Sequence, residues 1–150
     1  MIIRHIKPED VSAVMDLIRG LAEYEKDLDS VVNTTERLKS DIFEHNYCDS
    51  LVGEVDGNVV GFALYYTSYS TWKGPCLYLE DLFVLPEYRS IGLGSKLFDA
   101  IVNMAKSKGV ARMDWQVLDW NQSAIEFYER KKATIDRDWL NGRIFLSKNE

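Results

Sequence analysis

The order of its predicted elements assigns this chain of 150 residues to the α/β class, with a mixed sheet at its centre. Short runs rich in β-branched and aromatic residues alternate with longer runs of helical periodicity. The dipeptide Asp56-Gly57 joins two strand-like runs as a two-residue hairpin turn. A third apolar run, Leu77 to Leu85, leads into the turn Arg89-Ser90-Ile91-Gly92-Leu93-Gly94 and a helix. These patterns predict the order β-α-α-β-β-β-α-β-α-β-β.

Periodicity and turn residues place each predicted element. In the first helix, 9–24, the apolar side chains recur on a single stripe. Thr34 or Thr35 can cap the second helix, and Gly109 is suited to end the third. The strands expected are Ile2–Ile6, Cys48–Val55, Asn58–Tyr69, Leu77–Leu85, Ala111–Val117, Thr134–Leu140 and Arg143–Ser147. The helices expected are Glu9–Tyr24, one that begins at Thr34 or Thr35, Lys96–Lys108 and Asn121–Arg130.

The composition predicts one soluble domain, 1–150, that works in the cytoplasm. Hydrophobic residues make up 46% and charged residues 28%, which is ordinary for a globular protein. The longest apolar run, 59–66, is too short to span a membrane, and the first residues do not resemble a secretory signal. Cys48 and Cys76 are expected to be reduced thiols, and the isolated His5 and His45 predict no metal site. The net charge of −6 argues against a nucleic acid partner.

The turn from Arg89 to Gly94 predicts an anion site. A glycine-containing turn between a strand and a helix offers N–H groups to a phosphate, most simply a pyrophosphate. A P-loop is excluded because Gly94-Ser95-Lys96-Leu97 lacks its Gly-Lys-Ser/Thr. A dinucleotide fingerprint is excluded because Leu97 stands where its third glycine should be. A glycine turn without any ligand is the remaining alternative.

Two adjacent carboxylates, Glu80 and Asp81, interrupt the apolar strand before this turn. A carboxylate next to a tethered substrate could act as a general base. Neighbouring residues of a regular strand point to opposite faces, so only one of the two should face the substrate. The other should then have a structural partner. Two solvated carboxylates on a half-exposed strand are the alternative.

Two signatures in the second half of the chain resemble those of a known superfamily. The segment from Arg89 to Gly94 resembles the Arg/Gln-x-x-Gly-x-Gly/Ala motif for acetyl-CoA in the GNAT superfamily of N-acetyltransferases. The segment from Asn121 to Tyr128 resembles its second signature, Asn-x-x-Ala-x-x-Phe-Tyr. Residues 21–25, 77–81 and 117–121 are similar to the spermidine/spermine and thialysine acetyltransferase branch.

This resemblance implies a GNAT-like α+β fold, with a mixed, mostly antiparallel twisted sheet of about six to seven strands and about four flanking helices. It implies an enzyme that transfers the acetyl group of acetyl-CoA directly to a primary amine, through a tetrahedral intermediate. The acceptor would be a polyamine, a diamine or a lysine-like amino acid such as thialysine. An alkylamine has a pKa near ~10.4 and is protonated at neutral pH, so the enzyme needs a base. The resemblance favours Glu80 as this base and Tyr128 as the acid for the CoA sulfur, although Tyr128 could also be a core aromatic.

The resemblance also implies two groups of binding residues. The residues expected to bind acetyl-CoA are Leu82, Phe83, Val84, Arg89, Ser90, Ile91, Gly92, Leu93, Gly94, Ser95, Asn121, Ala124 and Tyr128. The residues expected to bind the amine are Tyr24, Glu25, Trp72, Glu80, Asp81, Trp115, Gln116 and Trp139. Aromatic walls and carboxylates suit a cationic chain. Trp115 and Trp139 could equally be core residues, and Arg89 could serve only the fold.

The implied assembly is a homodimer in which the subunits share the acceptor site. The chain departs from the branch at Arg130-Lys131-Lys132-Ala133, where members carry Arg-x-Gly-Ala, and it has no acid before Trp72. Two rival functions are an acetyltransferase for proteins or peptides and a non-catalytic acyl-CoA-binding module. Bulky aromatics around Trp72 and Trp139 argue against the open groove that a peptide needs, while Glu80 and Tyr128 argue against the non-catalytic module.

Overall fold

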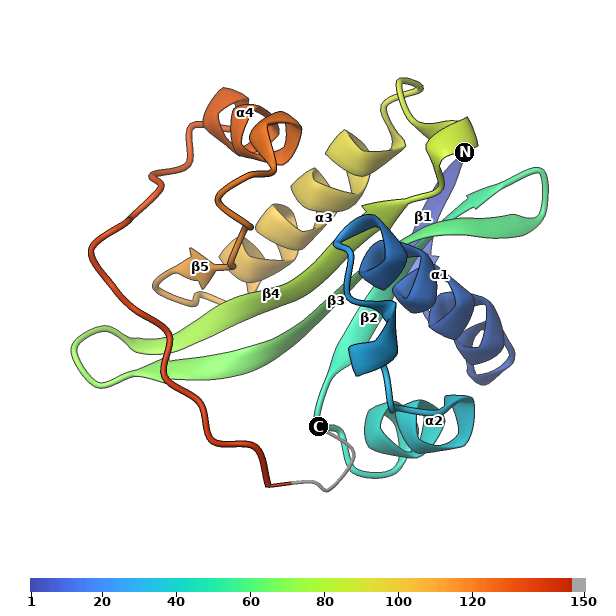
Figure 1. Ribbon diagram of the computed structural model, residues 1–150, viewed down its shortest axis with the longest axis horizontal. Helices are drawn as coiled ribbons and strands as arrows, with labels where there is room; N and C mark the ends of the chain where they lie inside the picture. Colours follow the sequence, from blue (N-terminus) through green and yellow to red (C-terminus); the bar gives the residue numbers. More distant parts are fainter. Residues whose placement is uncertain (147–150) are drawn as a thin grey trace. The chain divides into compact units, whose positions relative to one another are not determined.

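The computed structural model of the protein describes residues 1–146 (Figure 1). They divide into two compact units, Met1–Asp114 and a C-terminal unit that begins at Trp115. The larger unit carries the sheet, and the smaller unit carries the last helix. Ser147, the end of the final predicted strand, lies outside the described residues.

The larger unit is built on one sheet with the strand order β1-β2-β3-β4-β5. Neighbouring strands from β1 to β4 are antiparallel, while β5 runs parallel to β4 through two residue pairs. The predicted mixed, mostly antiparallel sheet is confirmed. Its strands are β1 (Ile2–His5), β2 (Asp49–Val55), β3 (Asn58–Ser70), β4 (Gly74–Val84) and β5 (Met113–Asp114).

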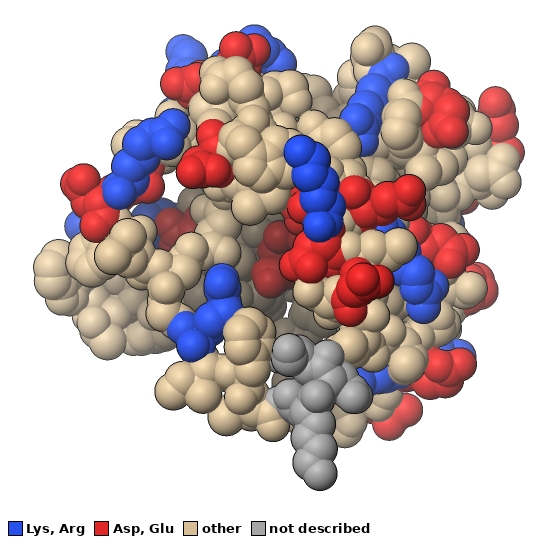
Figure 2. Space-filling view, in the orientation of Figure 1, with Lys and Arg blue, Asp and Glu red and all other residues tan. Residues whose placement is uncertain are grey.

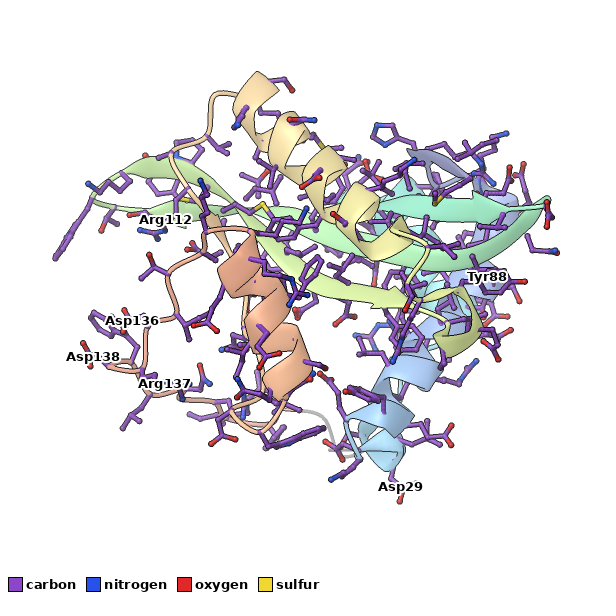
Figure 3. All side chains as sticks on the ribbon, turned by 90° about the horizontal axis from the view of Figure 1, so that it is seen from above. Asp29, Tyr88, Arg112, Asp136, Arg137 and Asp138 are labelled. Atoms are coloured by element: carbon purple, nitrogen blue, oxygen red, sulfur yellow. The ribbon has the colours of Figure 1, made fainter. Side chains whose placement is uncertain are left out.

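Three α-helices of the larger unit cover the two faces of this sheet. In Figures 1 and 3, α1 and α2 lie on one face and α3 lies on the other. The α-helices of the chain are α1 (Val11–Tyr24), α2 (Thr35–Phe43), α3 (Leu93–Ser107) and, in the smaller unit, α4 (Gln122–Arg130). Single 3-10 turns occur at η1 (Pro8–Asp10), η2 (Leu28–Ser30) and η3 (Pro86–Tyr88). The predicted helices are confirmed, with shifts of a few residues at their ends.

The main core lies between α1, α2 and the sheet. It contains the apolar stripe of α1, with Val14 and Met15 fully buried against Phe62 and Leu64 of β3. Burial of side chains of this size stabilises a fold by about 1.5–3 kcal/mol each. The face of the sheet that packs on α1 and α2 is therefore the face of Phe62 and Leu64.

Close approach on the other face depends on a strand glycine. A Cβ atom added to Gly53 of β2 would lie 2.8 Å from Cδ1 of Leu93, the first residue of α3. Leu93 is fully buried, so it has little room to move. The absence of a side chain at Gly53 thus positions the N-terminus of α3 against the sheet.

Local sequence signals explain most element boundaries. Thr34 caps α2 by accepting a hydrogen bond from the N–H of Arg37 at 3.2 Å, which settles the choice between Thr34 and Thr35. Asp56 and Gly57 both have positive φ, 51° and 80°, as the predicted two-residue hairpin requires. Gly109 ends α3 with a φ of 69°, also as predicted.

The end of α4 shows the consequence of the departure at Arg130-Lys131-Lys132-Ala133. Ala133 donates its N–H to the carbonyl of Tyr128 at 3.1 Å, and Lys132 donates to Glu129 at 2.9 Å. This pair of bonds is a Schellman motif, whose central residue adopts a left-handed conformation. Lys132 holds that position with a φ of 65°, where glycine would be less strained.

The two strands predicted at Thr134–Leu140 and Arg143–Ser147 are wrong as far as residue 146, because the described part of this segment forms no strand. Asp136 accepts a hydrogen bond from the N–H of Asp138 at 2.8 Å, a local turn contact that competes with strand pairing. Figure 3 labels Asp136, Arg137 and Asp138 on this irregular stretch. The described sheet therefore has five strands rather than six or seven, and the strand predicted at Ala111–Val117 is reduced to β5.

Candidate active site

One shift of register between β3 and β4 positions the acidic residues. Asp81 pairs with Leu64 and Leu79 pairs with Tyr65, so Glu80 has no partner on β3 and forms a β-bulge. Side chains that oppose each other directly share a face of the sheet. Asp81 therefore points to the face of Leu64, which is the face of α1 and α2. The expectation that Glu80 and Asp81 point to opposite faces holds for a regular strand, and it does not apply here because the strand is bulged at Glu80.

The charge of Glu80 also affects side chains on this face. Tyr66 lies two residues beyond Leu64 on β3, and its ring packs on that of Tyr78 with the centroids 5.1 Å apart. Burial raises the pKa of both phenols, that of Tyr78 to about 12, and the nearby Glu80 carboxylate raises both further. Sequence reasoning missed this pair of tyrosines, because only the bulge brings them beside the carboxylates.

Asp81 carries the most perturbed carboxyl group of this face. The side chain is half-buried, and its pKa is raised to about 7 by burial, then by the charges of Glu80 and Glu25. Glu25 caps the C-terminus of α1, and burial raises the pKa of its carboxyl group as well. Within residues 1–146, no cation or hydrogen-bond donor pairs with the Asp81 carboxylate. Three carboxylates thus share one negative site.

Further acidic residues surround the end of α1. Figure 2 shows a concentration of Asp and Glu side chains over this end and the segment that follows it. Glu23, Glu25, Asp27 and Asp29 belong to this part of the chain, and Figure 3 labels Asp29. Such a surface attracts cations over a distance of about 10 Å at moderate salt.

A cavity of about 500 Å³ lies between the end of α2, the start of β2 and the middle of β3. Cys48 and Tyr66 line it, and Tyr66 also belongs to the face of the carboxylates. Tyr65 also lines the cavity, and its hydroxyl donates a hydrogen bond to Oδ2 of Asp49 at 3.3 Å. Burial raises the pKa of the Cys48 thiol to about 11, so this cysteine is a poor nucleophile at neutral pH.

A second feature of β4 that could bind a ligand is its backbone edge toward β5. In the described residues, β5 pairs with only two residues of β4. Leu85 donates its N–H to the carbonyl of Val60 in β3 at 2.9 Å. Alternate residues of a strand direct their N–H groups to opposite edges, so those of Leu82 and Val84 point away from β3. An extended chain that contains amides could pair with this edge as an added strand.

The turn after β4 has the geometry of an anion site. Ser90 and Gly92 have positive φ values of 70° and 87°, and Gly92 is the N-cap of α3. No side chain caps α3 at this residue. Such a turn aims backbone N–H groups and the positive end of the helix dipole at one point. This geometry fits the predicted role of Ser90 to Ser95.

Gly94 is not required by the fold. It lies inside the first turn of α3, and a Cβ there would meet only Cγ2 of Val84, at 3.8 Å. Glycine in a helix costs about 0.5–1 kcal/mol relative to alanine. The missing side chain at Gly94 therefore leaves open space beside the N-terminus of α3.

Arg89 holds the end of β4 to α1. Its Nε donates to the carbonyl of Val84 at 3.0 Å. Its guanidinium carbon lies 5.3 Å from the ring centre of Tyr24 and 5.4 Å from that of Phe83. Two cation–π contacts and a hydrogen bond give this arginine a structural role, the alternative left open by the sequence. They also place Tyr24 beside the predicted acyl-CoA residues.

The remaining predicted residues belong to the smaller unit. The rings of Trp115 and Tyr128 pack with centroids 4.9 Å apart, and Tyr128 is buried. Asn121 caps α4 by accepting from the N–H of Ala124 at 3.3 Å. Gln116 donates a hydrogen bond to Asn141.

Two predicted tryptophans lie in solvent. Trp72 is 91% exposed in the turn between β3 and β4, and Trp139 is 83% exposed. Glu80 lies six residues along β4 from Gly74, which at a rise of about 3.3 Å per residue is about 20 Å. Trp72 therefore does not reach Glu80 within one chain.

Two features of other protein classes do not occur in residues 1–146. No helix there is long and apolar enough to cross a membrane. No three His, Cys, Asp or Glu side chains of this part come together in a group that could hold a metal ion.

Comparison with known proteins identifies the class. The sequence profile of the acetyltransferase (GNAT) family matches residues 15–132. The chain therefore belongs to this family of N-acetyltransferases, which use an acyl-CoA as co-substrate, and the resemblance seen in its motifs is confirmed.

Its relatives narrow the class further. The chain is similar to the thialysine N-epsilon-acetyltransferase of Bos taurus, with 44% identity over 86% of this chain and 81% of that protein. It is also similar to that of Caenorhabditis elegans, with 38% identity over 93% of this chain and 88% of that protein. A human spermidine/spermine N(1)-acetyltransferase-like protein 1 is 34% identical, over 87% of this chain and 20% of that longer protein.

Solved structures show the same fold at low identity. An aminoglycoside acetyltransferase from an uncultured soil metagenomic sample superposes with a TM-score of 0.81 and 21% identity, over 97% of this chain and 96% of that chain. A mutant Bacillus halodurans protein superposes equally well, with 20% identity over 97% and 100% of the two chains.

We predict that Gly94→Ala separates stability from acyl-CoA binding. The alanine should raise the free energy of unfolding by about 0.5 kcal/mol, because it favours helix. Its methyl group should weaken CoA binding by about tenfold or more, because it occupies the space beside the N-terminus of α3. Urea unfolding and calorimetric titration with CoA measure the two effects. Gly142→Ala is the control, since a Cβ there meets nothing within 4 Å; equal CoA affinity in both variants would contradict the role of Gly94.

We predict that Asp81→Asn stabilises the protein at high pH only. The rise of the Asp81 pKa from 3.8 to about 7 means that its charged form is disfavoured in the folded state. The gain should be fully present above pH 7, decrease as the pH falls, and vanish below about pH 3.8, where folded and unfolded states are both protonated. The upper limit of this gain in the free energy of unfolding is about 4 kcal/mol. We expect about 2 kcal/mol, because water still reaches a half-buried carboxylate and screens its charge.

Urea unfolding at a series of pH values measures this difference. Asp29→Asn, an exposed substitution of the same kind, is the matched control and should show no such pH dependence. A gain for Asp81→Asn that is independent of pH would contradict the shifted titration.

Proposed function

We propose that this protein transfers the acetyl group of acetyl-CoA to the primary amine of a small acceptor that carries further positive charge. The observation that supports this most directly is that Glu80 and Asp81 of β4 lie with Glu25, at the end of α1, on one face of the sheet, next to the edge of Leu82 and Val84 that points away from β3. The carboxylates suit a cationic amine, and the edge suits the amides of an acyl-CoA arm. Both units act in this proposal as a single acetyltransferase domain, 1–150.

The residues have distinct roles in the proposed reaction. The N–H groups of Leu82 and Val84 hold the acyl-CoA arm and the oxygen that becomes negative in the tetrahedral intermediate. The turn from Ser90 to Ser95 holds the pyrophosphate at the N-terminus of α3. A carboxylate of the Glu80 and Asp81 pair removes the proton that keeps the amine unreactive. The remaining predicted acyl-CoA residues, Phe83, Arg89, Ile91, Gly92, Leu93, Asn121 and Ala124, shape this site.

The acceptor is proposed to be a diamine or a lysine-like amino acid such as thialysine. The thialysine N-epsilon-acetyltransferases similar to this chain support this class of amine. Tyr24 and Glu25, at the end of α1, offer one aromatic and one acidic contact on the carboxylate face. Trp115, Gln116 and Trp139 are proposed to complete the pocket. The reducing cytoplasm is the proposed location, which suits the two free cysteines.

The direct test is an amine panel. With acetyl-CoA present, we expect thiol release above the no-amine blank, and the highest kcat/KM for thialysine, lysine or a diamine rather than for peptides. Thiol detection and mass analysis of the product measure rate and the acetylated nitrogen. A lack of release with every amine would refute the proposal, CoA binding without turnover would favour a binding module, and faster reaction with peptides would favour a protein acetyltransferase.

We predict that Tyr128→Phe slows the chemical step more than it weakens CoA binding. The phenol is proposed to protonate the departing CoA sulfur, a contribution of about 100-fold or more. Phenylalanine keeps the ring that packs on Trp115, so the fold of the smaller unit should survive. We expect kcat to fall by about 100-fold while the Kd for CoA changes by less than about threefold. An unchanged kcat would refute this role.

A homodimer is also proposed. Trp72 and Tyr69, at the β3–β4 turn, are strongly exposed and lie too far from Glu80 to act within their own chain. Leu140, Ile144 and Leu146 of the C-terminal segment are more than 80% exposed. Large exposed apolar side chains in such number indicate an interface. Light scattering should give twice the mass of 17.3 kDa, and a monomer mass would contradict this.

A further inference from the structure

We propose that Asp81 is the residue that first accepts the proton of the acceptor's ammonium group, and that Glu80 passes this proton on to water. This inference rests on the proposed amine acetylation and deepens it, because sequence resemblance assigns the proton to Glu80. The two carboxylates are neighbours in the chain, yet the bulge gives them different surroundings.

The β-bulge at Glu80 decides which side chains share a face with Asp81. Without it, Asp81 and Tyr78, three residues apart, would point to opposite faces of the strand. With Glu80 unpaired, Asp81 opposes Leu64 and points to the face of α1 and α2. Asp81 is half-buried there, whereas Glu80 is exposed. An exposed carboxylate exchanges protons directly with water. A half-buried carboxylate is shielded from water and can accept a proton from a substrate that lies beside it.

The surroundings of Asp81 favour a proton. The acidic groups that act on this face are Glu80 and Tyr78 of β4, Tyr66 of β3, Cys48 before β2, Asp41 of α2 and Glu25 at the end of α1. The Arg89 guanidinium lies over the rings of Phe83 and Tyr24 on the same face, but no cation of residues 1–146 pairs with Asp81. An incoming ammonium would supply the missing positive charge and lie against the carboxylate that is to deprotonate it.

The chemistry of Asp81 matches this task. Its pKa of about 7 narrows the gap to that of an alkylammonium, ~10.4, by about half compared with an ordinary Asp. A base that titrates near the working pH is both available and strong enough to be useful.

The proton balance is as follows. The carboxylate of Asp81 takes one proton from R–NH3+, leaving R–NH2 with a free electron pair. This pair forms the C–N bond to the thioester carbon, and the C–S bond breaks as the second proton of the nitrogen goes to the sulfur through Tyr128. Asp81 then gives its proton to water by way of Glu80. Each turnover produces one amide, one thiol and one released proton.

The test is the pH profile of kcat/KM for the wild type and three variants with the best amine of the panel. The wild type should lose activity below about pH 7, as Asp81 becomes protonated. The kcat/KM of Asp81→Asn should be lower by about 100-fold or more at pH 8. Its pH profile should lack the acidic limb, which is the fall in activity below about pH 7. Glu80→Gln should keep activity within about tenfold and move the limb to lower pH, because it removes a charge that raises the pKa of Asp81. Asp16→Asn, an exposed carboxylate of α1 outside the proposed site, is the matched control and should leave both the limb and the plateau unchanged.

The opposite pattern would overturn the inference. If Glu80→Gln abolishes activity and Asp81→Asn keeps it with a shifted limb, Glu80 is the base and Asp81 only tunes it. CoA binding by calorimetry identifies a misfolded variant, and Asp81→Glu, which keeps the carboxyl group, should recover part of the activity. A wild type inactive with every amine would refute the proposed function and this inference together, whereas activity that survives Asp81→Asn would refute only the inference.

Discussion

The pairing of β3 with β4 is the constraint on which the rest of the site depends. One extra residue on β4, Glu80, shifts the register, so that Asp81 opposes Leu64 and Tyr78 opposes Tyr66. The same strand then offers carboxylates on one face and, beyond the end of β5, backbone N–H groups along its free edge. A regular strand would separate these features, because its side chains alternate strictly between the two faces. The bulge thus brings the proposed amine site close to the proposed acyl-CoA site.

Keeping three carboxylates together opposes folding, and the larger unit tolerates it because its core is well packed. Val14, Met15 and Phe62 are fully buried between α1 and the sheet, and contacts of this kind each contribute about 1.5–3 kcal/mol. Arg89 adds a bridge from the end of β4 to Tyr24 at the end of α1. Part of this stability is used to hold Asp81 and Glu25 close together without a cation. A site that lacks its counter-charge is prepared for a substrate that brings one.

Local signals in the sequence were sufficient where a few neighbouring residues decide the conformation. The cap at Thr34, the hairpin at Asp56-Gly57 and the helix end at Gly109 each depend on interactions within about five residues, and each was predicted. The turn at Gly92 belongs to this class as well. Prediction failed at the C-terminal strands, because alternation does not supply a partner strand and the local bond between Asp138 and Asp136 competes with one. Nor could it decide the faces of Glu80 and Asp81, because register is set by long-range pairing.

The sequence by itself determined the family, the mixed α/β fold, the glycine-containing turn predicted to bind an anion, and the set of acidic and aromatic residues available for an amine. These depend on motifs and periodicities that are contiguous in the chain. Only the tertiary structure decided that Asp81 lies with Glu80 and Glu25 on one face, that Arg89 is occupied with Tyr24 and Phe83, and that Trp72 lies far from the carboxylates of its own chain. The physical reason is that burial, strand register and the electrostatic coupling of distant residues arise only when separate segments pack together.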